Sequence, residues 1–186
     1  MGTAMFRLMF FVCLAFLANF SFAQKTSEKI SLPHELQSEL PWFALVAKDD
    51  AETYNGVLTK DKIKAIAAQK KSKRVVLSFF ATWCIPCREG LARMNKKAAE
   101  LEKNGVLVVL VNVGEDDYGK VSKWISEYAK DGWQLGFDRF NNVPENFGLK
   151  RSGEMPLPRT LILDPDLRPL LLIGDEGDDF PNVAYP

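Results

Sequence analysis

The sequence is poor in histidine and cysteine, the residues that supply most zinc ligands and the nucleophile and base of cysteine proteases. It holds one histidine, His34, and three cysteines among 186 residues. A zinc site needs four ligands, and His34 lies far along the chain from the two clustered cysteines. Cysteine-protease chemistry needs a histidine base, and His34 sits in a polar stretch that suits solvent exposure instead. The sequence therefore argues against a metal site and against cysteine-protease catalysis.

The chain also lacks an excess of charge of either sign. It has 24 basic and 24 acidic residues, so no net field attracts a nucleic acid. It contains no glycine-rich phosphate loop, which leaves nucleotide use without support. A chain of 186 residues that is 47% hydrophobic can bury one core, but not two. We expect one folded domain with no cofactor and no nucleic-acid partner.

A hydrophobic run long enough to span a bilayer is missing too. The apolar run from Leu8 to Ala18 has eleven residues, whereas a membrane span needs about 20. Arg7 is the only charged residue of the first 23, and Ser21-Phe22-Ala23 suits cleavage by a signal peptidase after Ala23. The pattern predicts that residues 1–23 are an export signal and that the protein is periplasmic or otherwise exported. An uncleaved anchor is the alternative.

Removal of residues 1–23 would leave two cysteines, Cys84 and Cys87. Disulfides form and persist in exported proteins. A structural disulfide usually closes a longer loop, because linking residues only three apart gains little chain entropy. The spacing and the expected compartment therefore favour a redox role for this pair.

Hydrophobic patterning predicts a single α/β domain with a mixed sheet over residues 41–174. Apolar runs predict strands at 75–80, 106–113, 133–137, 160–163 and 170–173, the last two as an antiparallel hairpin. Helical spacing predicts helices around 61–70, 91–101 and 121–128, and a helical turn at 142–147, with Asn104-Gly105 as the stop after the second helix. Residues 24–40 are expected to form a loosely attached arm, with a short edge strand following it. Residues 175–186 are expected to form a solvated acidic tail, with calcium binding by its acidic run as the alternative.

The cysteines stand where the first buried strand gives way to a helical pattern. Cys84 would lie at the helix N-terminus, whose partial positive charge and free N–H groups stabilise a thiolate. Pro86 suits the first helical turn, where its missing N–H costs nothing. Cys87 would lie one turn further on and could attack a mixed disulfide formed at Cys84. We therefore predict Cys84 as the attacking thiol and Cys87 as the resolving thiol.

Trp83-Cys84-Ile85-Pro86-Cys87 after an apolar strand resembles the thioredoxin superfamily. Ala81-Thr82-Trp83-Cys84 and the export signal resemble its periplasmic TlpA/ResA branch, and Pro41-Trp42-Phe43-Ala44-Leu45 is similar to the opening motif of that branch. The likeness covers residues 40–174, and it implies a thioredoxin fold and a protein-disulfide oxidoreductase. The sequence does not set the direction of exchange, and the likeness to the branch favours a reductant. The implied partners are protein thiols or disulfides and a membrane electron donor.

Pro156-Leu157-Pro158-Arg159-Thr160 resembles the cis-proline strand of the same superfamily. The resemblance implies a cis bond between Leu157 and Pro158, facing the cysteines. An ordinary trans proline that starts a strand is the alternative. Five residues are expected to contact substrate: Trp83, Ile85, Pro86, Leu157 and Pro158.

The chain departs from the superfamily pattern at two places that carry a carboxylate elsewhere. Ser78 replaces the buried aspartate of thioredoxin, and Gly90 replaces the glutamate of the ResA branch. Glu89 is displaced by one residue, which is about 100° around a helix, so it should face elsewhere. The identity of the group that deprotonates Cys87 is therefore open.

The closing helix of the fold is not expected either, because residues 174–186 are acidic and hold two prolines. Together with the missing carboxylates, this leaves a second function open, a thioredoxin-fold binding module whose cysteines are nearly inert. A thiol peroxidase is a third interpretation, but the proline–threonine pattern expected before its reactive cysteine is absent.

Overall fold

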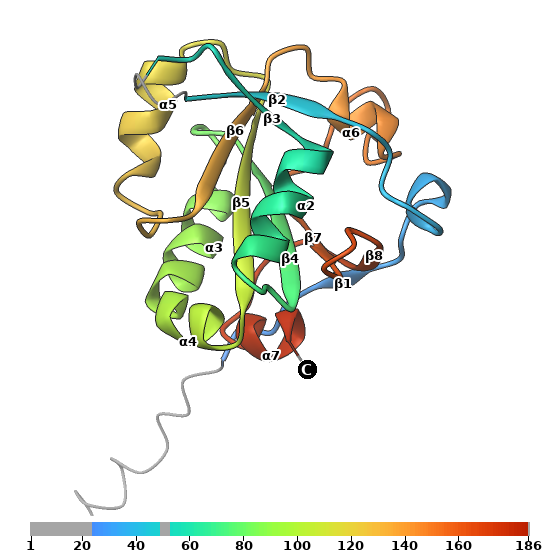
Figure 1. Ribbon diagram of the computed structural model, residues 1–186, viewed down its shortest axis with the longest axis vertical. Coiled ribbons are helices and arrows are strands. Elements are labelled where there is room, and N and C mark those ends of the chain that lie inside the picture. The colour runs from blue at the N-terminus through green and yellow to red at the C-terminus, as the bar shows by residue number, and fades with distance from the viewer. Residues whose placement is uncertain (1–23, 49–52, 186) are drawn as a thin grey trace, which may run out of the picture.

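The computed structural model describes residues 24–48 and 53–185, and the predicted export signal over 1–23 lies outside them. Over these described residues, one sheet of eight strands runs through the fold, with helices on both faces (Figure 1). The strands are β1 (Lys29–Ile30), β2 (Ala44–Ala47), β3 (Gly56–Thr59), β4 (Arg74–Phe80), β5 (Val106–Val113), β6 (Gln134–Asp138), β7 (Arg159–Leu163) and β8 (Pro169–Ile173). The helices are η1 (His34–Leu36), α2 (Lys60–Gln69), α3 (Ile85–Lys96), α4 (Ala98–Lys103), α5 (Tyr118–Ile125), α6 (Val143–Asn146) and α7 (Phe180–Ala184). Within the described ranges, no helix is both long and apolar enough to cross a membrane.

The strand order is β1-β8-β7-β4-β5-β6-β2-β3. The central strands β4, β5 and β6 are parallel, and β7 and β8 form an antiparallel hairpin beside β4. The mixed sheet and the hairpin predicted from the sequence are thus confirmed. The predicted stop before β5 is also present, since Gly105 takes a left-handed conformation with φ 73°.

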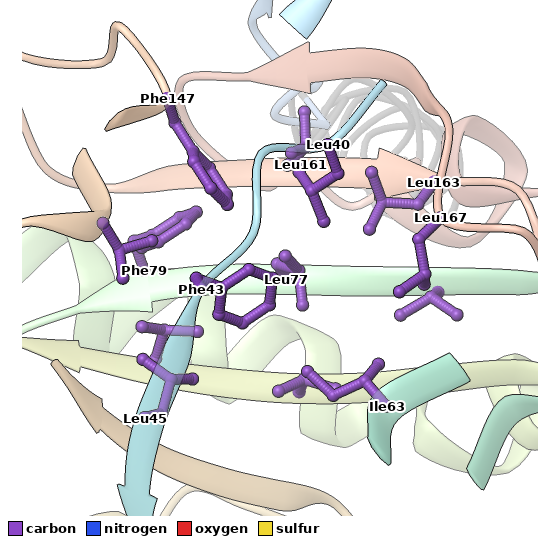
Figure 2. Packing of buried hydrophobic residues seen from close by; sticks show 14 of the residues in the cluster. Leu40, Phe43, Leu45, Ile63, Leu77, Phe79, Phe147, Leu161, Leu163 and Leu167 are labelled. Carbon is purple, nitrogen blue, oxygen red and sulfur yellow. The ribbon is translucent and has the colours of Figure 1, made fainter. Parts of the chain in front are cut away.

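Alternation along β4 divides the core into two layers, because successive side chains of a strand point to opposite faces. Val75, Leu77 and Phe79 face the layer covered by α2 and α6. In that layer, the Phe147 ring meets Phe79 edge-on, with 6.2 Å between ring centroids. Figure 2 labels both residues within this cluster. Val76 and Phe80 face the opposite layer, covered by α3, α4, α5 and α7. Both cysteines lie in this second layer.

The N-terminal arm is bound to the domain instead of being loosely attached. Its strand β1 pairs with β8, and Leu36 and Leu40 are completely buried in the α2 layer. The strand predicted just after the arm is present as β2, but it is not an edge strand. The edge position belongs to β3, which pairs with β2 and is not among the strands predicted from the apolar runs.

The C-terminal segment differs from the solvated tail expected from its acidic composition. Phe180 and Ala184 are buried in the α3 layer, and they lie on the short helix α7. A long closing helix is indeed missing from the described residues, but the short helix α7 packs in the same layer as α3. Glu176 is buried as well, with 1% of its surface exposed. This segment therefore belongs to the folded domain.

Candidate redox site

The site is centred on a disulfide between Cys84 and Cys87 at the beginning of α3. Cys84 is the N-cap of the helix, and its Sγ accepts a hydrogen bond from the Cys87 N–H at 3.2 Å. Pro86 occupies the first turn, as the sequence predicts. Both sulfur-bearing residues are buried, Cys84 with 4% of its surface exposed and Cys87 with 1%. Cys84 is therefore the more accessible of the two to another molecule.

The loop between β4 and Cys84 is fixed by a carboxylate from the loop after β5. Glu115 accepts hydrogen bonds from the Thr82 backbone N–H, at 2.7 Å, and from the Thr82 hydroxyl. It also accepts one from the side-chain amide of Asn112 at 2.7 Å. These contacts hold the residues just before Cys84 to the neighbouring strand, and no local motif in the sequence indicates them.

An apolar rim, formed by the exposed side chains of Trp83, Ile85 and Pro86, lies beside the disulfide. Trp83 and Ile85, on either side of Cys84, are 68% and 61% exposed. Pro86 is exposed too. Solvent-facing aromatic and aliphatic side chains beside a reactive centre are typical of surfaces that bind other proteins.

A cleft of about 270 Å³ opens next to this rim. The bond between Leu157 and Pro158 is cis. Pro158 is buried, whereas Leu157 is half-buried and packs against the core cluster that contains both cysteines. The cleft is lined by Trp83, Val113, Gly114, Asn141, Gly153, Glu154, Met155 and Leu157. The structure thus brings two of the five expected substrate contacts, Trp83 and Leu157, to one cleft.

Among the described residues, no cluster of histidine, cysteine, aspartate and glutamate could hold a metal ion. The reactive groups at the site include the two cysteines and the ionisable side chains around them.

One such ionisable group, Glu176, is missing from the sequence-based predictions. Its carboxylate lies in the α3 layer, between the sheet and the helix. Oε1 accepts hydrogen bonds from the hydroxyl of Ser78 on β4, at 3.2 Å, and from the hydroxyl of Thr160 on β7. Ser78 and Thr160 are paired across the two strands, so both hydroxyls point at the same spot. Burial raises the pKa of Glu176 above the usual range of a glutamate.

The second carboxylate oxygen of Glu176 lies against Gly90 on α3. A Cβ atom at Gly90 would come within 2.2 Å of Oε2, so a larger residue there would collide with the carboxylate. Ser78 and Gly90 are the two positions where the sequence lacks the acidic residue that the superfamily pattern carries. The structure fills the space between them with a carboxylate from elsewhere in the chain.

The sequence signal for Glu176 is indirect. The residue follows the last strand and has no local motif that marks it as buried. The signal is that two small residues, Ser78 on β4 and Gly90 on α3, lie on neighbouring elements. Together they leave room for a side chain that must come from a distant part of the chain.

Comparisons with known proteins identify a family and several relatives for this chain. The model of the AhpC/TSA family matches residues 45–168. The thiol-disulfide oxidoreductase ResA of Bacillus thuringiensis subsp. konkukian is 27% identical over 116 residues, which are 62% of this chain and 63% of the relative. The chain therefore spans less than two thirds of the length of this curated relative.

Solved structures show the same architecture. A Chlorobium tepidum protein assigned as a thiol:disulfide interchange protein, DsbE, superposes with a TM-score of 0.56 at 26% identity, over 79% of this chain and 87% of that one. The thioredoxin domain of a thiol-disulfide oxidoreductase from Bacteroides vulgatus gives a TM-score of 0.60 at 17% identity, over 83% of this chain and 95% of that one. The sheet order, the cysteine pair at the start of α3 and the family match lead to one conclusion: this chain has a thioredoxin fold and belongs to the AhpC/TSA family.

Proposed function

We propose that this protein is a thiol-disulfide oxidoreductase that exchanges a dithiol for a disulfide with protein substrates. The observation that carries the proposal is the Cys84–Cys87 disulfide at the N-terminus of α3, beside an exposed apolar rim. The names of the ResA relative and of the Chlorobium tepidum protein support the same reaction.

In the reductive direction, the Cys84 thiolate attacks a substrate disulfide and forms a mixed disulfide, releasing one substrate thiol. The Cys87 thiolate then attacks the sulfur of Cys84, which releases the second substrate thiol. The chain loses two electrons to the substrate and ends as the disulfide seen in the structure. The helix N-terminus favours the thiolate form of Cys84. The greater exposure of Cys84 supports its role as the first nucleophile.

Substrate contacts are assigned to the rim and the cleft. Trp83, Ile85 and Pro86 would bury apolar side chains of the substrate. The Leu157–Pro158 segment would lie along the substrate backbone, at the cleft that Trp83 also lines. We further propose that the protein is exported through residues 1–23 and works as a reductant, kept reduced by an electron donor in the membrane.

The test is the reduction potential of the Cys84–Cys87 pair, measured by equilibration of the purified protein with glutathione redox buffers. A value of about −250 mV or lower is expected for a reductant, and about −120 mV would make it an oxidant of exported proteins. A pair that never equilibrates with glutathione would refute the exchange reaction and favour a binding module. A Cys84→Ser variant is the matched control, because it keeps Cys87 and cannot form the pair.

A peroxidase assay distinguishes the proposed function from the remaining alternative, a thiol peroxidase. The proposal expects reduction of insulin disulfides and no consumption of hydrogen peroxide beyond that of the Cys84→Ser variant. Rapid peroxide consumption that depends on Cys84 would overturn the assignment of protein disulfides as the substrate.

A further inference from the structure

We propose that Glu176, carried on the segment after β8, is the base that takes the proton from Cys87 when the mixed disulfide is resolved. The inference rests on the proposed function and adds a residue to it. A base must come from outside the usual positions, since neither Ser78 nor Gly90 can accept a proton from a thiol at this site.

Glu176 lies close to Cys87 because it contacts Gly90, which lies on the same face of α3 as Cys87. Cys87 and Gly90 are three residues apart, and residues at this spacing lie on one face of a helix with Cβ atoms about 5–6 Å apart. The Glu176 Oε2 atom lies 2.2 Å from the place of a Gly90 Cβ. It is therefore no more than about 8 Å from the Cβ of Cys87, a distance that the thiol and one water molecule can span.

The chain keeps the space beside Gly90 open at a cost in stability. Gly90 lies inside α3 and needs no left-handed backbone conformation. A glycine in a helix interior is about 1 kcal/mol less favourable than alanine. The glycine is explained by the carboxylate that would collide with any side chain at this position.

The charges around Glu176 leave its carboxylate suited to accept a proton. The backbone carbonyl of Glu176 accepts a hydrogen bond from the Arg93 side chain on α3 at 2.6 Å, and Arg93 also pairs with Asp175 at 2.8 Å. The charge of Arg93 is thus engaged by Asp175 and by a carbonyl, and the charge of Asp175 raises the pKa of Glu176 further. Glu89 on the same helix faces solvent and lies 3.9 Å from Arg93. A carboxylate whose pKa is raised toward that of a thiol is better matched to accept the thiol proton.

The N-terminal arm and α3 together fix the backbone around Glu176. The Gly177 N–H donates to the Ser27 hydroxyl at 3.0 Å, and the Asp178 N–H donates to the Lys25 carbonyl at 2.7 Å. A Cβ at Gly177 would lie 2.4 Å from the backbone of the arm, so only glycine allows this approach. The arm and Arg93 thus hold the backbone on either side of the buried carboxylate.

The resolving step conserves atoms and electrons. Before it, Cys84 is bonded to a substrate sulfur, Cys87 carries its proton and Glu176 is ionised. The proton moves to Glu176, the Cys87 thiolate attacks the Cys84 sulfur, and the bond between Cys84 and the substrate breaks. The electron pair leaves with the substrate sulfur, which receives the proton from Glu176, directly or through water. The substrate is reduced and the Cys84–Cys87 disulfide forms.

The test follows the two attacks separately. The reduced protein is mixed with the aromatic disulfide DTNB in a stopped-flow instrument, and the coloured thiolate is followed as it is released. The first release reports attack by Cys84 and depends on the DTNB concentration. The second reports attack by Cys87 and does not. Wild type, Glu176→Gln and the control Glu89→Gln are compared across pH.

We expect Glu176→Gln to leave the first release unchanged and to slow the second by roughly 100-fold at neutral pH, the lower end of general-base effects. The difference should shrink as pH rises, because the Cys87 thiol then ionises without help. Glu89→Gln should match the wild type in both phases. Equal slowing of both phases, or an unchanged second phase, would overturn the role of Glu176. A wild type without any release would instead refute the proposed function itself.

A second variant keeps the proposal testable if Glu176→Gln does not fold. Glu176→Asp keeps a carboxylate but withdraws it from the helix by one carbon. Glu176→Asp should slow the second release less than Glu176→Gln does. The rate of that release should still depend on pH, as in the wild type. A second phase as fast as that of the wild type at every pH would overturn the proposal.

Discussion

Replacement of Gly90 by alanine should have opposite effects on the free energy of unfolding of the natural chain and of a Glu176→Ala variant. In the natural chain, the new methyl group would lie 2.2 Å from Glu176 Oε2 and must push the carboxylate away. The backbone on either side of Glu176 is held by Arg93 and by the N-terminal arm, so the side chain itself must move. In a Glu176→Ala chain the obstacle is gone, and only the helix preference of alanine remains. We therefore expect Gly90→Ala to destabilise the first chain and to stabilise the second.

The magnitudes follow from two terms. Alanine gains about 1 kcal/mol over glycine inside a helix. Moving the carboxylate breaks its bonds to the hydroxyls of Ser78 and Thr160, each worth about 0.5–1.5 kcal/mol. The net change in the natural chain is a loss of up to about 2 kcal/mol. The coupling between the two sites is then about 1–3 kcal/mol, and each kcal/mol shifts the Tm by about 2–4 °C in a chain of this size.

The assay is thermal and urea unfolding of the four proteins of this cycle, all with the disulfide intact. Gly119→Ala is the control, since this helical glycine has only Asp117 Oδ1 nearby, at an ordinary contact distance of 3.7 Å. Its effect should be small and equal with and without Glu176. If Gly90→Ala stabilises both chains, or destabilises both by the same amount, Glu176 does not fill the space beside Gly90 and the reasoning fails.

Three further predictions concern Glu176, Gly177 and Trp83. Burial raises the pKa of Glu176, so between its unfolded and folded pKa values the native state binds more protons than the unfolded chain. Stability should fall as pH rises above about 4.3, the ordinary pKa of a glutamate, and Glu176→Gln should remove that fall in urea titrations at several pH values. Gly177→Ala should cost about 1–3 kcal/mol in urea unfolding, because its Cβ would overlap the backbone of the arm. Trp83→Ala should raise the KM for insulin reduction and leave the first DTNB release unchanged, because the small disulfide does not need the exposed rim.

Each of these three predictions has a result that would contradict it. A Glu176→Gln variant that loses stability with rising pH as steeply as the wild type would mean that another group titrates. Full stability of Gly177→Ala would mean that the arm does not pack on this glycine. An unchanged KM in Trp83→Ala would move the substrate contact away from the rim.

The part of the fold that the sequence predicts well depends on short-range patterns. The apolar run that becomes β4 and the cysteine spacing that follows it occupy adjacent residues, so the amino-acid pattern alone places the start of α3. The hairpin β7–β8 is equally clear, because its turn residues lie between two apolar runs. In each case one stretch of chain holds the whole signal.

The missed features depend on pairing between distant segments. Strand β1 has only two residues and exists because β8 offers its edge, and no local pattern marks so short a strand. The acidic segment after β8 is predicted to be solvated because its composition is polar. It is ordered by hydrogen bonds to residues about 150 positions earlier. Composition reports the average preference of a segment, whereas the burial of Glu176 depends on its contacts with Ser78, Thr160 and Gly90.

The position of Glu176 also bears on the choice between an enzyme and a binding module. The binding-module hypothesis rests on two expected losses, the carboxylate near the cysteines and the closing helix. The structure contains a buried carboxylate beside α3 and a short helix, α7, over the same face. A chain that kept the fold only as a scaffold would have no need for a helical glycine cleared for a buried acid, since alanine at Gly90 with a neutral residue at 176 would be more stable. The proposed proton transfer from Cys87 would give this unfavourable pair a use, which favours the enzyme over the binding module.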